Sequence, residues 1–239
     1  NPAYVRSASI EEFGRLQQQA MGLIKLVDVA PEQPGNLEFI RQMSHDVRVS
    51  VAHTCTSYDD ACAAFDAGAR HMTHLFNAMP ALHHREPGPI AAGAERNDVT
   101  AEIIADGVHI HPAMVRLAFA LFGDDRMILI SDSLRACGLG DGEYELGGQQ
   151  FFVKGNRATI ANGSLAGSVS DVMACMRTTV RTMGIPLTSA VKAATVNPAR
   201  ALGLDGKLGA IAPGYQADAV VLDRDLSIKH VVLRGKAIV

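Results

Sequence analysis

The stretch that decides the fold is VRVSVAHTCTSYDDACAAFDAGARHMTHL, residues 47–75. Its apolar run Val47–Ala52 predicts a buried strand, and Tyr58–Ala67 carries apolar residues at helical spacing. Ser57, which is followed by acidic residues, is a typical helix N-cap. A second apolar run, Met72–Leu75, comes next. The stretch therefore predicts a strand–helix–strand unit of a parallel sheet.

The same alternation continues on both sides of this stretch. Five strands in one run indicate a parallel sheet, and a barrel of this type has eight strands. We therefore expect an α/β fold, a (β/α)8 TIM-type barrel that is incomplete here because three strands are not found. The further strands are expected at Leu23–Val29, Val99–Ala105 and Met127–Ser131, and the further helices at Leu37–Ser44 and Pro112–Phe122.

After the fifth strand the pattern changes. We expect residues 1–212 to form a partial barrel catalytic domain, and residues 213–239 to supply the C-terminal strands of a small β domain, a β-sandwich. The elements expected in this part are a hairpin over 141–160, helices over Asp171–Met183 and Leu187–Ala194, and antiparallel strands over Ala217–Asp223 and Ile228–Val239.

Composition excludes several classes of function. The 239 residues carry a formal charge of −3, which provides no broad positive field for nucleic acid or anionic membranes. No apolar run reaches the ~18 residues of a membrane span. The four cysteines show neither zinc spacing nor a disulfide framework, so a cytoplasmic location is expected. The start at Asn1, without an initiator methionine, indicates a processed or truncated chain.

Titratable side chains follow four consecutive predicted strands: His53, His74, His109 and Asp132. The C-terminal strand ends of such a barrel converge on the active site. A lone histidine at a strand end is more often a core or surface residue, but four such positions in succession favour a metal-dependent hydrolase. His71 is ambiguous, because its spacing of three from His74 points the two to opposite faces of a strand. Surface positions are expected for His45, His83, His111 and His230.

The run THLFNAMP at residues 73–80, with REPG at residues 85–88, resembles the N-acetylglucosamine-6-phosphate deacetylases of the amidohydrolase superfamily. The resemblance follows the chain in order over nearly its whole length. Supporting matches are Leu26–Glu32, Ala52–Thr54, Ile104–His109, Ser131–Asp132, Ser164–Ser168, Asn197–Arg200 and Gly214–Asp218.

This resemblance implies hydrolysis of N-acetylglucosamine 6-phosphate to glucosamine 6-phosphate and acetate with a divalent metal ion, zinc in the first place and iron or another divalent ion otherwise. It implies His53 and His74 as metal ligands, Asp132 as the catalytic acid and base, and a homo-oligomer, a dimer, for the full-length protein. The implied substrate contacts are Asn77, Ala78, Arg85, His109, Leu165, Ala166 and Gly167.

Two features depart from the family pattern. The third metal ligand of the family is a glutamate in a His-Leu-Glu-Gly-Pro motif, which this sequence lacks, and we expect the chain to start just downstream of it. Because two histidines alone hold a metal weakly, residues 1–239 by themselves are expected to bind metal weakly. Glu32 is interpreted as structural. Ser131-Asp132-Ser133 replaces the usual Thr-Asp-Ala but keeps the aspartate.

Two alternatives to the deacetylase stay open. One is another amidohydrolase, a cyclic-amide hydrolase or a deaminase; Lys25, however, lies at the wrong end of its strand to serve as a carboxylated lysine. The other is a non-catalytic fragment or relative. Arg85 suits a phosphate because its planar guanidinium makes paired charge-assisted hydrogen bonds. Its alternative role is a weak surface ion pair with Glu86 or a neighbour.

Overall fold

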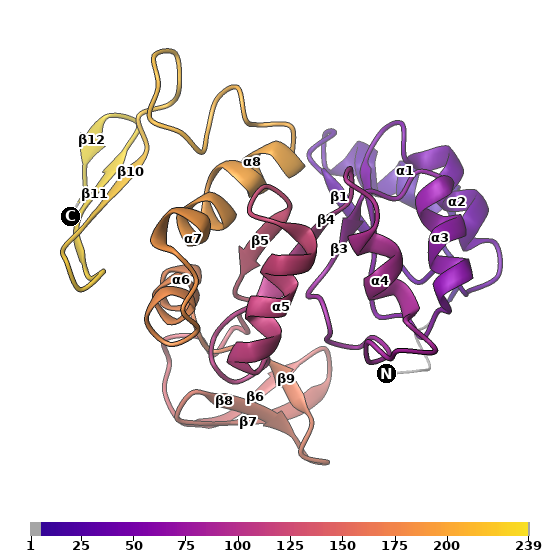
Figure 1. The fold of residues 1–239 in the computed structure, drawn as a ribbon, viewed down its shortest axis with the longest axis horizontal. Helices are drawn as coiled ribbons and strands as arrows, with labels where there is room; N and C mark the ends of the chain where they lie inside the picture. Colours follow the sequence, from indigo (N-terminus) through magenta and orange to yellow (C-terminus); the bar gives the residue numbers. More distant parts are fainter. Residues whose placement is uncertain (1–5, 239) are drawn as a thin grey trace.

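The computed structural model describes residues 6–238. Its centre is a parallel sheet in the order β1-β2-β3-β4-β5 (Figure 1). All four neighbouring pairs run parallel, as the strand–helix alternation of the sequence predicts. The strands are β1 (Leu26–Val29), β2 (Arg48–Val51), β3 (His71–Met72), β4 (Thr100–Ile104) and β5 (Met127–Ile130).

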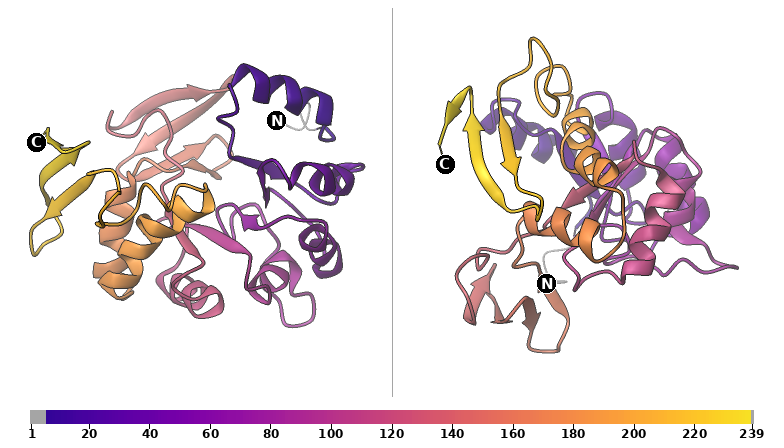
Figure 2. Two further views of the ribbon diagram at one scale, coloured as in Figure 1. Left: turned by 90° about the horizontal axis from the view of Figure 1, so that it is seen from above. Right: turned by 60° about the vertical axis from the view of Figure 1, so that its left-hand side comes forward.

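Helices connect these strands, because a parallel pair needs a long crossover. In Figure 2 they lie on the outer side of an arc of strands. Ser57 caps α3, accepting a hydrogen bond from the backbone N–H of Asp60 at 3.1 Å, so the predicted helix start is confirmed. The connecting helices are α2 (Asn36–Met43), α3 (Tyr58–Asp66), α4 (Gly88–Ala94) and α5 (Pro112–Phe122), and α1 (Ile10–Gln19) precedes β1.

The two faces of the parallel sheet differ in chemistry. The side chains of Val49, Val51 and Ile103 are buried in the main hydrophobic core with residues of the surrounding helices. Alternate residues of a strand point to the opposite face. That face carries polar groups, among them Ser50 and His71, which are both fully buried. The helix side therefore supplies the packing, and the other side carries a polar network.

Polar contacts connect this face from strand to strand. The Nδ1 atom of His71 lies 2.5 Å from the hydroxyl of Thr100, and its Nε2 atom lies 3.1 Å from a carboxylate oxygen of Glu102. Thr73 donates to the carboxylate of Asp28 at 2.7 Å, and its hydroxyl lies 2.8 Å from that of Ser50. His71, which the sequence left ambiguous, is therefore a buried member of the network.

Two antiparallel sheets follow the parallel one. The predicted hairpin over 141–160 is three strands of a four-stranded sheet, and the last predicted strand is split in two by a turn. The C-terminal sheet lies beyond α7, away from the parallel sheet (Figure 1). The elements are β6 (Gly142–Leu146), β7 (Gln149–Lys154), β8 (Arg157–Ile160), β9 (Leu165–Gly167), α6 (Val172–Arg181), α7 (Leu187–Ala194), α8 (Val196–Ala201), β10 (Ala219–Leu222), β11 (Ile228–Leu233) and β12 (Lys236–Ala237).

Several details differ from the sequence-based expectation. Helices α1, α4 and α8 and strand β9 were not expected. Strand β3 covers His71–Met72 and not Met72–Leu75, because the chain turns at His74, whose φ is 37°. Val239, the end of the last predicted strand, lies outside the described residues, as do residues 1–5. Over the described range, no helix combines the length and the apolar character that a membrane crossing requires.

Candidate active site

The two predicted metal ligands and the predicted catalytic aspartate share an unusual backbone conformation. His53, His74 and Asp132 follow strands β2, β3 and β5, and their φ angles are 44°, 37° and 49°. A left-handed conformation costs a non-glycine residue roughly 1–2 kcal/mol. Such strain persists where the surrounding structure imposes it, and it concentrates at functional sites. The strand ends therefore hold these three side chains in positions that local preference alone does not favour.

The structure brings the two predicted metal ligands together. The ring centroids of His53 and His74 are 4.6 Å apart, at an interplanar angle of 72°. His74 is buried, and its Nδ1 atom has no hydrogen-bond partner among the described residues. A buried polar nitrogen without a partner is costly, and its lone pair would be available to a metal ion.

Charge around His53 also suits a metal. Burial and the neighbouring ring of His74 lower the pKa of His53, while the carboxylates of Asp28 and Asp132 act in the opposite direction. The net lowering favours the neutral imidazole, which is the form that binds a metal. A cavity of about 340 Å³ adjoins His53 and is also lined by Asp28 and Asn36. Asp28 and Asp132 are thus close enough to His53 for their charges to affect its pKa.

The segment Leu165–Gly167 is tied to the strand end that carries Asp132. The carbonyl of Asp132 accepts from the backbone N–H of Ser168 at 2.9 Å, and the N–H of Leu134 donates to the carbonyl of Ser168 at 2.8 Å. Gly167 has a φ of 137°, and a Cβ there would lie 3.0 Å from Leu134 and 3.2 Å from the carbonyl oxygen of Asp132. The glycine therefore permits the close approach.

His109 is held by a carboxylate that the sequence reasoning did not single out. The Oδ2 atom of Asp106 lies 2.8 Å from Nδ1 of His109, and its Oδ1 atom accepts the backbone N–H groups of Val108 and His109, each at 2.9 Å. Both side chains are buried. Nδ1 of His109 donates to this carboxylate, and the contact fixes the orientation of the ring. The Asp-Gly-Val-His spacing was the signal for this pair.

The predicted phosphate segment begins beside His74. Asn77 donates from its side chain to the carbonyl of His74 at 3.1 Å. Ala78, with a φ of 48°, accepts the backbone N–H of Thr54 at 3.0 Å, which ties this segment to the one after β2. Arg85 is exposed, and its Nη1 atom lies 2.7 Å from Nε2 of His84. The observed partner of Arg85 is thus a histidine and not Glu86.

The amidohydrolase family model matches residues 4–238. The chain belongs to the amidohydrolase family. It is 38% identical over 233 residues to the N-acetylglucosamine-6-phosphate deacetylase of Bacillus subtilis. The matched region is 97% of this chain and 59% of that protein. It is 37% identical over 236 residues to the N-acetylgalactosamine-6-phosphate deacetylase of Escherichia coli O157:H7, over 98% of this chain and 62% of that protein.

Solved structures of relatives agree with this amidohydrolase fold. The N-acetyl-D-glucosamine-6-phosphate deacetylase of Mycobacterium smegmatis superposes with a TM-score of 0.95 at 40% identity, over all of this chain and 64% of that one. The enzyme of Thermotoga maritima gives 0.91 at 30% identity, again over all of this chain and 64% of that one. The resemblance drawn from the sequence motifs is confirmed. The chain spans about three fifths of the length of these relatives.

The donor set of this amidohydrolase is partial. Within residues 6–238, no three histidine, cysteine, aspartate or glutamate side chains come together as a metal site. The two predicted ligands, His53 and His74, would supply two donors, whereas a catalytic zinc usually has three protein ligands and a water. Glu32 accepts the hydroxyl of Thr54 and, at 2.8 Å, the backbone N–H of Cys55, and it thereby orders the segment after His53. These contacts support the interpretation of Glu32 as structural.

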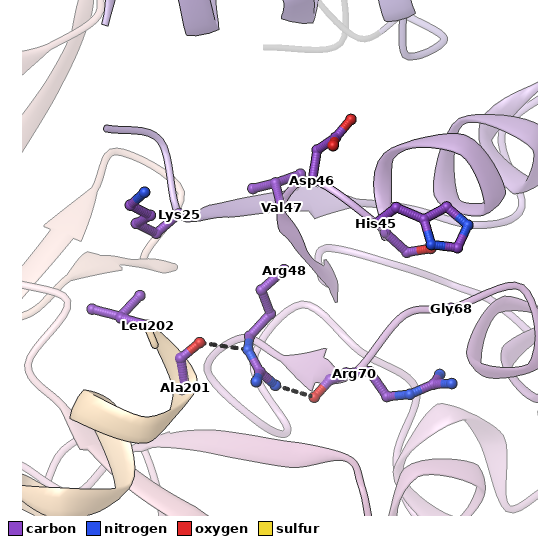
Figure 3. Close-up of a pocket in the computed structure, with 10 residues that line it drawn as sticks. Lys25, His45, Asp46, Val47, Arg48, Gly68, Arg70, Ala201 and Leu202 are labelled. Atoms are coloured by element: carbon purple, nitrogen blue, oxygen red, sulfur yellow. Dashed lines mark hydrogen bonds between the residues drawn. The ribbon is translucent and has the colours of Figure 1, made fainter. Parts of the chain in front are cut away.

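A second cavity, of about 310 Å³, lies at the other end of the parallel strands (Figure 3). Arg48 begins β2, and its guanidinium donates to the carbonyls of Ala201 at 2.5 Å and Arg70 at 3.1 Å. In open α/β sheets, ligands bind outside the carboxyl ends of the strands, and this cavity lies at the opposite ends. Arg48 therefore ties α8 to the sheet, away from His53.

The other histidines lie as expected. His45, His83, His111 and His230 are exposed, and His111 also caps α5 by accepting the backbone N–H of Ala113 at 3.2 Å. Surface placement of these four side chains is confirmed.

Proposed function

We propose that the protein is a metal-dependent deacetylase that hydrolyses the N-acetyl group of N-acetylglucosamine 6-phosphate to glucosamine 6-phosphate and acetate. The observation that carries this proposal is the apposition of His53 and His74 at strained strand ends beside Asp132. Relatives that carry the name of this activity support the substrate. The 4-epimer, N-acetylgalactosamine 6-phosphate, is the second candidate, because a relative named for it is 37% identical.

The donors present fit a divalent ion, with His53 and His74 as ligands. Zinc is the first candidate, and iron or another divalent ion is the alternative. When bound, such an ion supplies Lewis acidity toward the amide carbonyl and lowers the pKa of a coordinated water toward ~7. The ligand set requires a further protein ligand outside the described residues.

Asp132 transfers the proton. Its carboxylate takes the proton of the attacking water and then delivers it to the departing sugar amine. His109 donates a hydrogen bond to the carbonyl oxygen of the amide as negative charge develops there. Its ring orientation is set by Asp106, whose hydrogen bond at 2.8 Å holds Nδ1.

The segment after β3 binds the sugar phosphate. Arg85 offers a planar guanidinium with charge-assisted hydrogen bonds to the phosphate. Asn77 and Ala78 complete this side of the substrate. Leu165, Ala166 and Gly167 lie over the substrate, which their attachment beside Asp132 supports.

The same proposal includes the architecture of the whole protein. Residues 1–212 contribute five of the eight strands of a (β/α)8 barrel, and residues 213–239 contribute strands to a small β-sandwich. Coverage of 64% of a solved relative at a TM-score of 0.95 supports this arrangement. The assembly proposed is a cytoplasmic homodimer, with no nucleic-acid or membrane partner.

Acetate release tests the function. The full-length protein, loaded with zinc or iron, would be given N-acetylglucosamine 6-phosphate, its 4-epimer and a cyclic amide, and acetate and free amine would be quantified. Release of one acetate per amine from a phosphorylated amino sugar is expected. Hydrolysis of the cyclic amide alone would favour the other amidohydrolase class, and no hydrolysis with full metal content would favour a non-catalytic relative.

A further inference from the structure

The segment between β3 and α4 closes on itself and carries three adjacent basic side chains. It leaves the sheet after Met72 and ends at Gly88, the first residue of α4, where a Cβ would lie 3.8 Å from the Cβ of Pro80. His83, His84 and Arg85 follow Pro80, and all three are exposed. The rings of His83 and His84 are 4.3 Å apart at an interplanar angle of 49°.

The contact between His84 and Arg85 has a defined direction. Arginine has donors and no acceptor, so at 2.7 Å its Nη1 atom donates to Nε2 of His84. The imidazole must then be neutral, with its own proton on Nδ1. The backbone N–H of Arg85 donates to Nδ1 of His83 at 3.4 Å, which adds a weak contact on the same segment.

This contact holds the guanidinium and leaves most of it free. It uses one of the five N–H donors of Arg85. An exposed arginine otherwise samples many rotamers, and ordering them when a ligand binds weakens binding. A carboxylate partner would also hold the side chain, but it would offset the positive charge that a phosphate needs. A neutral imidazole orients the arginine without this loss.

We propose that His84 is a positioning residue for phosphate recognition: it orients the guanidinium of Arg85 before the 6-phosphate of the sugar binds. The inference rests on the proposed function and adds a specificity-determining residue to it. Because His84 acts through Arg85, its contribution depends on the presence of the arginine. It should affect binding of the phosphorylated sugar and not the chemical step.

A double-mutant cycle tests this dependence. The full-length, metal-loaded protein would be compared with His84→Ala, Arg85→Ala and the double variant, using the 6-phosphorylated sugar and its unphosphorylated analogue. His230→Ala, which removes an exposed histidine from β11, is the matched control. Melting temperature and metal content would confirm that each variant is folded.

The expected result is specific. Arg85→Ala lowers the preference for the phosphorylated sugar roughly ten- to a hundredfold, as loss of a charged hydrogen-bonding partner does. His84→Ala lowers it about three- to tenfold, through KM and not kcat, as loss of one hydrogen bond does. The double variant matches Arg85→Ala. His84→Gln, whose amide oxygen can accept from Arg85, restores part of the preference.

Other outcomes overturn the inference separately from the proposed function. If His84→Ala leaves the preference unchanged while Arg85→Ala lowers it, the function stands and the positioning role falls. If the two losses multiply in the double variant, His84 binds phosphate by itself. If the unchanged protein has no preference for the phosphorylated sugar, the proposed substrate and the inference both fail.

Discussion

Asp106→Asn tests how the site holds His109. The carboxylate accepts three hydrogen bonds, two from backbone N–H groups and one from the imidazole, and its side chain is fully buried. Asparagine has nearly the same shape but no charge. Its carbonyl oxygen can keep the two backbone bonds, and its NH2 group then faces Nδ1 of His109. The ring loses its acceptor and has to change tautomer or turn away.

The magnitude and its pH dependence follow from the environment. Burial acts to raise the pKa of Asp106, but the hydrogen bonds from the ring and the two N–H groups outweigh it and bring the pKa below 3.8. A lowered pKa means that the carboxylate stabilises the fold above the unfolded-state value of ~3.9, and that this is lost as pH falls through the folded value. One hydrogen bond to a charged group contributes about 1.5–3 kcal/mol, which is the expected destabilisation at pH 7.

Urea unfolding of the full-length protein at several pH values measures the destabilisation caused by Asp106→Asn and its pH dependence. The difference in unfolding free energy between the unchanged protein and Asp106→Asn should be constant from pH 7 to about 4.5 and should narrow only below about pH 4. Asp46→Asn, at an exposed carboxylate, is the control and should change little. A difference that widens as pH falls from 7 to 5 would show that burial dominates and that the folded pKa of Asp106 is raised, which would refute the reasoning.

Three further predictions concern the neighbouring groups. Asp132→Asn should keep the fold and the metal, because asparagine tolerates a φ of 49°, yet lose most turnover, since an amide cannot carry the proton; near-normal kcat with full metal content would exclude this role. Gly167→Ala should lower the unfolding free energy by about 1–3 kcal/mol and more than Gly163→Ala, which also has a positive φ but open space around it, as measured by urea unfolding. Removal of metal with a chelator should abolish acetate release and zinc should restore it; activity that survives with no detectable metal would exclude a metal-dependent mechanism.

Local patterns in the sequence predicted most of the parallel sheet and its helices. Strand β2 and helix α3 were predicted because an apolar run and a capped helical pattern lie entirely within one stretch. The short β3 could not be predicted, since its end depends on the left-handed turn at His74. The role of His71 could not be predicted either, because its partner Glu102 comes from the next strand.

In the candidate site, too, local sequence patterns predicted some residues, and other contacts depend on the folded conformation. The positions of His53 and His74 followed from the strand-end rule and the resemblance, and the structure places their rings side by side. Asp106 had a local signal, three residues before His109, that could have been found. Arg85 differs, because the sequence offered Glu86 as its partner and only the conformation of the segment selects His84.

Hydrogen bonds made by neighbouring residues maintain the strained φ angles of His53, His74 and Asp132, and the sequence does not reveal these bonds. Each residue leaves the sheet where a hydrogen-bonded neighbour limits its movement. Thr54, next to His53, donates its backbone N–H to the carbonyl of Ala78 at 3.0 Å. Thr73, next to His74, is bonded to Asp28 and lies 2.8 Å from Ser50, and the carbonyl of Asp132 is held by Ser168. Relaxation of one φ angle would therefore break bonds made by other strands, each a net loss of roughly 0.5–1.5 kcal/mol. That loss is comparable to the strain itself, which explains how the three residues keep their left-handed conformations.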